Sequence, residues 1–151
     1  MKRLVFESLN EMNFQRKMGD PLSAMGIGKT QLIKDWLDEM GVKHYTINDD
    51  YSIDVDGGVS LDSKNLSKFP DYIQFNMVSG YFNCDCNQLV SLRGCPRYVG
   101  GSFNCFYNSL ISLEGCPKRV GGYFDCSDNA KKFTFEDVKK LCDVKGKNYV
   151  R

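Results

Sequence analysis

Thiol groups at a regular spacing are the residues of this sequence most able to do chemistry. Cys84, Cys105 and Cys126 follow one another at intervals of 21 residues, and Cys86 stands two residues after the first. Thiolates bind zinc and act as nucleophiles, so a metal site is one interpretation. The three regularly spaced cysteines belong to a column that we expect to face inward, where cysteine packs as a small apolar side chain. We therefore favour core packing for them and expect Cys86 to be exposed.

A cysteine nucleophile would need a base, and His44 is the only histidine in the chain. It stands at the start of a predicted hairpin, away from the thiol columns, so a cysteine hydrolase is disfavoured. Cys95 and Cys116 form a second column that we also assign to the core. Nothing in the sequence directs the chain to an oxidising compartment, so the seven cysteines are expected to be free thiols.

Two further motifs resemble ligand-binding loops but are incomplete. Residues 26–30 read GIGKT, like the end of a phosphate-binding loop, but Ser23 stands where that motif requires its first glycine. Residues 54–57 read DVDG, which suggests a calcium loop, but the later glutamate of such loops is missing. We predict an ordinary helix entry for the first and strand residues for the second. The sequence therefore predicts no catalytic residue, no cofactor and no metal ligand, and it indicates a protein that is not an enzyme.

The elements that carry these residues repeat three times with a period of 21 residues. The recurring columns are Val78, Val99 and Val120; Gly80, Gly101 and Gly122; Phe82, Phe103 and Phe124; Cys84, Cys105 and Cys126; and Asn87, Asn108 and Asn129. A period near 20 residues is typical of a solenoid, in which each unit buries its apolar face against its neighbours. An earlier, shorter copy covers residues 57–70, so we expect about four coils.

Within each unit, Phe-x-Cys-x-x-Asn-x-Leu-x-x-Leu follows the leucine-rich-repeat pattern. We predict one short strand per coil in a parallel sheet, with the phenylalanines stacked inside. The asparagines should satisfy backbone groups where the chain leaves each strand. The glycine pairs at 100–101 and 121–122 should supply backbone conformations that a side chain opposes.

Capping elements are expected at both ends, because an open stack exposes apolar faces. Thr30 should cap a helix that reaches Gly41, and strands at 44–47 and 51–55 should form a hairpin. Thr134 should cap a second helix that ends at Gly146. The predicted organisation is one structural domain, with an N-terminal helix and hairpin segment (1–56), a solenoid (57–133) and a C-terminal helical cap (134–151).

Composition restricts the class of protein. With 42% hydrophobic residues, 26% charged residues and a net charge of +1, the chain is neither disordered nor a polycationic nucleic-acid binder. Glu7 interrupts the first apolar run, and no run approaches the roughly 20 apolar residues of a membrane helix. We expect a cytosolic protein.

The outward side chains of the repeats are the remaining candidates for function. In solenoids such a face commonly binds partners, and exposed aromatic residues often anchor protein interfaces. The alternative is that these side chains only cover a narrow sheet. The candidate partner-binding residues are Tyr81, Asn83, Asp85, Asn104, Phe106, Tyr107, Tyr123 and Asp125.

Basic residues gather on or beside the predicted turns between coils. They are Arg93, Arg97, Lys118 and Arg119. We expect them to be solvated, because no aromatic residues interleave with them as in a nucleic-acid groove.

Three segments together resemble a known group of proteins. They are YTINDDYSIDVDGGVSL, repeats of the form VGGxFxCxxNxLxSLxGCP, and FTFEDVKKLCDVKGKNYV. The chain resembles, over about residues 30–151, uncharacterised leucine-rich-repeat-like proteins of tailed bacteriophages. The resemblance implies a viral protein in the cytoplasm of an infected bacterium, and it supplies no site residues. The hypothesis is a non-enzymatic module that binds a host or viral protein, to inhibit a host defence or redirect a host enzyme. The alternative is a structural or self-assembling virion protein.

Overall fold

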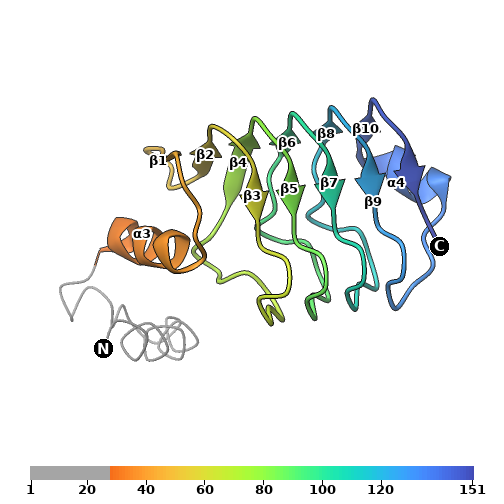
Figure 1. Ribbon diagram of the computed structural model, residues 1–151, viewed down its shortest axis with the longest axis horizontal. Coiled ribbons are helices and arrows are strands. Elements are labelled where there is room, and N and C mark those ends of the chain that lie inside the picture. Colours follow the sequence, from red (N-terminus) through yellow and green to blue (C-terminus); the bar gives the residue numbers. More distant parts are fainter. Residues whose placement is uncertain (1–27) are drawn as a thin grey trace.

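The computed structural model describes residues 28–151. They form a solenoid of about four coils with a helix at each end. The coils lie side by side along the long axis of the molecule, as Figure 1 shows. The repeat solenoid predicted from the 21-residue period is confirmed. None of the helices in this part of the chain is long and apolar enough to cross a membrane.

Each coil contributes two strands, one to each of two sheets. The first sheet has the order β1 (Tyr45–Ile47), β2 (Ile53–Val55), β4 (Phe75–Val78), β6 (Tyr98–Val99), β8 (Arg119–Val120) and β10 (Asp143–Val144). The second sheet has the order β3 (Val59–Ser60), β5 (Phe82–Asn83), β7 (Phe103–Asn104), β9 (Phe124–Asp125) and β11 (Asn148–Tyr149). All pairs are parallel except β1 with β2.

The prediction of a single strand per coil is wrong. The valine four positions before each phenylalanine lies on a strand of its own, and the bends between the two strands are formed by Ser79-Gly80, Gly100-Gly101 and Gly121-Gly122. These glycines are needed because neighbouring coils approach closely. A Cβ added at Gly101 would lie 2.9 Å from the carbonyl carbon of Gly80. In the bends of these three coils no glycine has a positive φ, so steric room is the reason there; in the corresponding bend between β2 and β3, Gly57 does have a positive φ, of 133°.

The phenylalanine column occupies the centre of the core. Phe82, Phe103 and Phe124 are in register on β5, β7 and β9, and all three are fully buried. The ring centroids of Phe82 and Phe103 are 5.9 Å apart and nearly parallel, and those of Phe103 and Phe124 are 5.1 Å apart. The predicted stacking is confirmed, and it ties the register of each coil to that of the next.

The asparagine column satisfies the backbone where the chain leaves the second sheet. The Asn108 amide nitrogen donates to the carbonyl oxygens of Cys84 and Cys105, at 3.0 and 3.2 Å. Its Oδ1 accepts from the Leu89 N–H at 3.0 Å. Asn87 and Asn129 repeat this pattern, so each asparagine joins its own coil to the preceding one. The structural role predicted for the column is confirmed.

The N-terminal end is covered by α3 (Lys29–Glu39) and the β1–β2 hairpin. Leu32, Ile33 and Leu37 are fully buried, and the Trp36 ring lies 6.1 Å from Phe69 and 6.4 Å from Phe75. The prediction that Thr30 caps this helix is wrong. Helical geometry begins one residue before it, so Gly28 is the N-cap and no side chain satisfies the first turn.

The C-terminal end combines a helix with two further strands. Thr134 caps α4 (Phe135–Leu141) as predicted, and Asp137 completes a capping box by accepting from the Thr134 N–H. The helix ends at Leu141, so the prediction that it continues to Gly146 is wrong. Val144 pairs with Val120 of the first sheet, and Gly146 forms the bend before β11. The last residues therefore add one more strand to each sheet.

We predict that Asn108→Ala lowers the free energy of unfolding by about 2 kcal/mol, because it leaves the buried Leu89 N–H without its acceptor and removes one of the two amide donors from the carbonyl oxygens of Cys84 and Cys105. Urea denaturation of purified protein would measure the loss. Ser109→Ala, at an exposed position next to it, is the matched control and should be close to neutral. Equal stability of both variants would contradict the role of the asparagine column.

Candidate partner-binding face

The side chains that alternate with the buried core residues at β5, β7 and β9 form a regular grid of nine positions, of which one, Ser127, is itself buried. They alternate with the buried phenylalanines and cysteines, because successive residues of a strand point to opposite sides. We call this grid the tyrosine–aspartate face. It consists of Tyr81, Asn83 and Asp85 at β5; Ser102, Asn104 and Phe106 at β7; and Tyr123, Asp125 and Ser127 at β9.

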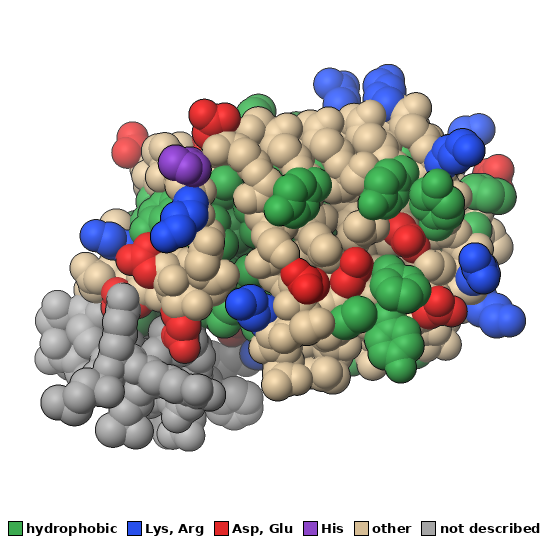
Figure 2. Space-filling model, viewed as in Figure 1, with side chains coloured by type: hydrophobic (Ala, Val, Ile, Leu, Met, Phe, Trp, Pro, Cys, Tyr) green, Lys and Arg blue, Asp and Glu red, His purple; other side chains and the backbone are tan. Residues whose placement is uncertain are grey.

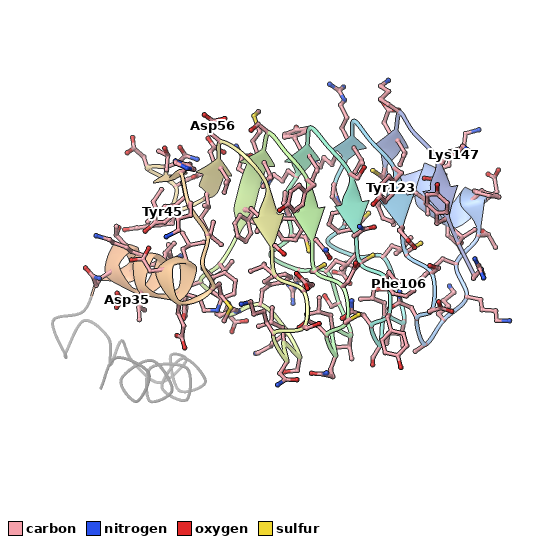
Figure 3. All side chains as sticks on the ribbon, in the orientation of Figure 1. Asp35, Tyr45, Asp56, Phe106, Tyr123 and Lys147 are labelled. Carbon is pink, nitrogen blue, oxygen red and sulfur yellow. The ribbon has the colours of Figure 1, made fainter. Side chains whose placement is uncertain are left out.

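The predicted partner-binding residues lie together. Seven of the eight belong to the tyrosine–aspartate face, and Tyr107 follows Phe106 at its border. Tyr81 is 51% exposed, Tyr107 61% and Tyr123 38%, whereas Phe106 is half-buried with its ring 5.9 Å from that of Tyr107. Figure 2 shows hydrophobic and acidic side chains gathered over these strands, and Figure 3 labels Phe106 and Tyr123 among them.

Sequence reasoning missed Tyr149, which extends this surface by one coil. Its ring is 45% exposed and lies 5.5 Å from the Tyr123 ring, nearly perpendicular to it. The signal was present in Val144-Lys145-Gly146, which matches Val120-Gly121-Gly122 at a longer spacing. The 21-residue period does not predict this coil, because α4 adds residues between β9 and β10.

Hydrogen bonds within the fold hold the polar side chains of the face in place. Asp85 accepts from the Phe106 N–H at 3.0 Å, and Asp125 accepts from the Ser127 N–H at 3.0 Å. In both aspartates this bond is to Oδ1. The Asn104 amide nitrogen donates to the Tyr123 hydroxyl at 3.1 Å, but its buried Oδ1 has no hydrogen-bond partner among residues 28–151. The face therefore presents hydrogen-bond acceptors in fixed positions.

Asp85 has the most perturbed carboxyl group of this surface. Partial burial raises its pKa from 3.8 to about 6, against the opposing effect of the Phe106 N–H. The negative charges of Asp125 and Asp62 raise this pKa further. At neutral pH the Asp85 carboxylate is therefore charged, and its charge lowers the stability of the fold. Ionisable groups with pKa values shifted in this way cluster at functional sites.

We predict that Asp85→Asn raises the melting temperature at pH 8. The pKa of Asp85 is about 6 in the folded protein and 3.8 in a solvated chain, so the destabilisation caused by its charge is complete above pH 6 and disappears as the pH falls toward 4. The gain from the variant should therefore shrink at pH 4.5. Thermal unfolding at the two pH values would measure it, with the exposed Asp49→Asn as control. A variant less stable than the wild type at pH 8 would contradict the assignment.

The first thiol column belongs to the core; in the second, Cys95 is buried and Cys116 is partly buried against the core. Cys84, Cys105 and Cys126 are fully buried, and the Cys105 thiol lies 3.4 Å from the Asp125 carbonyl oxygen. Burial raises the pKa of Cys126 and of Cys116 to about 12, so both stay protonated and poorly nucleophilic at neutral pH. The prediction of core packing is confirmed for the first column, and Cys86 is exposed as expected. In residues 28–151, no three His, Cys, Asp or Glu side chains are arranged to hold a metal ion.

The remaining motifs have structural roles where the structure describes them. Gly28 to Thr30 form the entry to α3, and the first two residues of the GIGKT motif lie outside the described part of the chain. Asp54 accepts from the Asn76 amide and the Met77 N–H, which links β2 to β4. The assignment of residues 54–57 to strand structure is confirmed for Asp54 and Val55. His44 is exposed between α3 and β1.

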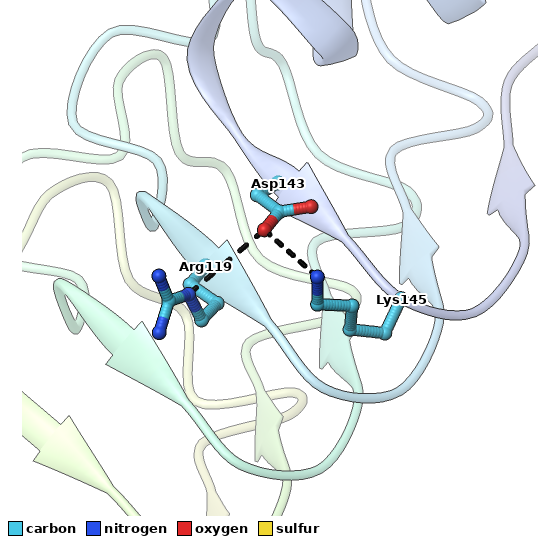
Figure 4. A network of polar contacts seen from close by, with 3 residues as sticks. All are labelled: Arg119, Asp143 and Lys145. Carbon is cyan, nitrogen blue, oxygen red and sulfur yellow. Dashed lines mark ion pairs between the residues drawn. The ribbon is translucent and has the colours of Figure 1, made fainter.

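The basic residues lie mainly along the first sheet. Arg97, Lys118 and Arg119 are exposed, and Asp143 on β10 lies 3.9 Å from Arg119 and 3.1 Å from Lys145 (Figure 4). Ion pairs at such exposed positions contribute about 0–1 kcal/mol each. The prediction that these basic side chains are solvated agrees with the exposure of Arg97, Lys118 and Arg119.

Comparison of the chain with models of known protein families, with curated proteins and with solved structures gave no match.

Proposed function

We propose that this protein is a non-enzymatic binding module that docks on a partner protein through the tyrosine–aspartate face. The observation that carries the proposal is the set of exposed aromatic rings on one side of a rigid sheet. Tyr81, Tyr107, Tyr123 and Tyr149 all present large surfaces to solvent there. Exposed aromatic residues with few charged residues among them are typical anchors of protein interfaces.

The rigidity of the face supports this function. Its backbone is bonded to the coils on both sides, and Asp85, Asp125 and Asn104 are each held by a hydrogen bond. Side chains that are already ordered lose little conformational entropy on association, so more of the contact energy appears as affinity. The exposed area of Tyr81 and Tyr123 would contribute roughly 4 kcal/mol if fully buried, at about 25 cal/mol per Å².

The biological setting follows from the resemblance to bacteriophage proteins. In this proposal the protein acts in the cytoplasm of an infected bacterium and binds a host or viral protein. Binding would block a host defence or redirect a host enzyme. The raised pKa of the buried thiols, as at Cys126, supports a role without thiol chemistry.

We predict that Tyr81→Ser/Tyr123→Ser weakens capture of the partner from lysate of phage-infected cells by at least about tenfold, because both anchors are lost. Quantitative mass spectrometry after affinity capture would measure it. Tyr51→Ser/Tyr98→Ser is the matched control, because these two tyrosines are exposed to a similar extent, 41% and 40%, but lie outside the face. Capture reduced equally by the control, or unchanged in the test variant, would contradict the proposal.

A second candidate is self-assembly as a structural component of a virion, favoured by the C-terminal end of the solenoid. Phe135 and Leu141 are 59% and 52% exposed there, and Val144 is only half-buried. Among the strands of residues 28–151, the last two, β10 and β11, have a neighbour on one side only.

For self-assembly we predict a mass above the monomer value of 17.2 kDa in light scattering, and a return to that value in Phe135→Ser/Leu141→Ser. Loss of exposed apolar area at the end should prevent association. A wild-type protein that stays monomeric at high concentration would exclude this candidate and leave the first one intact.

A further inference from the structure

We propose that the C-terminal end of the solenoid binds an extended acidic segment of another protein, which adds a strand beside β10. This inference goes beyond the proposed function, because it concerns a second docking surface that does not involve the tyrosine–aspartate face. Three observations support it: unpaired backbone groups at the last strands, an open hollow beside them, and positive charge around that hollow.

The regular ladder of the first sheet leaves backbone groups without partners at this end. The carbonyl oxygens of Val78, Val99 and Val120 each accept from an N–H of the next coil, at 2.8, 2.9 and 2.9 Å. The donor to Val120 is Lys145, and the next acceptor in the column is Val144. Within residues 28–151 the Val144 carbonyl has no hydrogen-bond partner, and β10 pairs only with β8. A strand edge of this kind is a template for a further strand.

The apolar interior beside this edge is also open. The three earlier valines of the column are buried, because a following coil covers each of them, whereas Val144 is only half-buried. Val144 lines an open hollow of about 510 Å³ together with Phe135 and Leu141 of α4, which are 59% and 52% exposed. A valine-sized side chain from an added strand would continue the column over Val144 and bury this apolar surface.

The second sheet closes its inner column with a polar residue. Asn148 on β11 is in register with Phe124, so it takes the position that the next phenylalanine of the column would occupy. The apolar part of the end therefore lies at β10 and α4, and for this reason we assign the added strand to β10 and not to β11.

Lysines determine the charge of the segment that fits here. Lys139 and Lys140 line the hollow, and neither forms an ion pair with another residue of the described chain. Asp143 also lines it, but its carboxylate is already paired, at 3.1 Å with Lys145 and at 3.9 Å with Arg119 (Figure 4). Basic side chains also gather at the right-hand end of the molecule in Figure 2. An acidic segment complements this charge.

A second copy of this chain that docked through the same end would fit less well. Lys139 and Lys140 of both copies would come close together, and like charges that face each other at an interface are unfavourable. We therefore assign the end to a segment of a different protein, and the test below separates this occupant from self-assembly.

The test is an NMR titration of ¹⁵N-labelled full-length protein at neutral pH with the peptide Glu-Glu-Val-Thr-Val-Glu-Glu. We expect a Kd of about 200 μM or tighter, with the largest amide shifts at Val144, Lys145 and Asn148. A peptide with proline in place of threonine loses a backbone N–H and should bind at least about fivefold more weakly. A peptide with lysines in place of the glutamates should be weakened by at least as much.

Apolar variants test the lining of the hollow. Phe135→Ser/Leu141→Ser should reduce affinity for the acidic peptide by at least about fivefold. Val90→Ser/Ile111→Ser is the matched control, because these side chains are 52% and 66% exposed but lie away from the C-terminal end. The amide spectrum of each variant would establish that it is folded.

Charge variants test the contribution of the lysines. Lys139→Gln/Lys140→Gln should reduce affinity for the acidic peptide by at least about threefold. Lys43→Gln/Lys64→Gln removes the same charge from exposed positions elsewhere and should change the affinity little.

Four results would overturn the inference. They are no binding of the acidic peptide, equal affinity for the proline peptide, equal losses in a test variant and its control, and shifts confined to amides away from the C-terminal end. Shifts at Val144 and Asn148 that appear on raising the protein concentration without peptide would identify a second copy as the occupant, and would also overturn it.

Failure of this inference is distinguishable from failure of the proposed function. Tyr81→Ser/Tyr123→Ser leaves the C-terminal end intact, so this variant should bind the acidic peptide with wild-type affinity. Loss of partner capture in that variant without any peptide binding to the wild type would leave the tyrosine–aspartate face as the docking site and remove the second one. Peptide binding at the C-terminal end with unchanged capture would do the reverse.

Discussion

The contact between one coil and the next is the interaction on which the rest of this structure depends. Two parallel hydrogen-bonded ladders, the phenylalanine column and the asparagine column all act at this contact. None of them can form within a single coil, so the coils stabilise one another in one register. The close approach at Gly80 and Gly101 keeps the bends aligned. Because the register is the same from β5 to β7 and from β7 to β9, outward side chains of these strands become neighbours in space although they are far apart in the sequence.

The function that we propose is a direct consequence of this register. Tyr81, Ser102 and Tyr123 form one row and Asn83, Asn104 and Asp125 form another, with no loop that has to close on a partner. Polar side chains are held by the backbone of adjacent coils, as in the bond from the Phe106 N–H to Asp85. The face thus holds its polar acceptors in fixed positions, although burial raises the pKa of Asp85 and makes its charge costly for the fold.

The sequence predicted the features that repetition determines. The period indicated the solenoid, and alternation around Phe103 separated buried from exposed positions. The first sheet was not predicted, because its strands β4, β6 and β8 are only two to four residues long and lie before the glycine bends, outside the leucine-rich-repeat pattern. Tyr149 and the unpartnered oxygen of Asn104 also escaped prediction. The first depends on a changed spacing in the last coil, and the second depends on side-chain geometry that no residue pattern encodes.

The most direct test of the stacked register is a nuclear Overhauser experiment on protein with labelled phenylalanine rings. The account predicts contacts between Phe82 and Phe103, whose ring centroids are 5.9 Å apart, and between Phe103 and Phe124, at 5.1 Å. It predicts no direct contact between Phe82 and Phe124, because Phe103 lies between them. A strong contact between Phe82 and Phe124, or the absence of both neighbouring contacts, would contradict the register and with it the grid of outward residues.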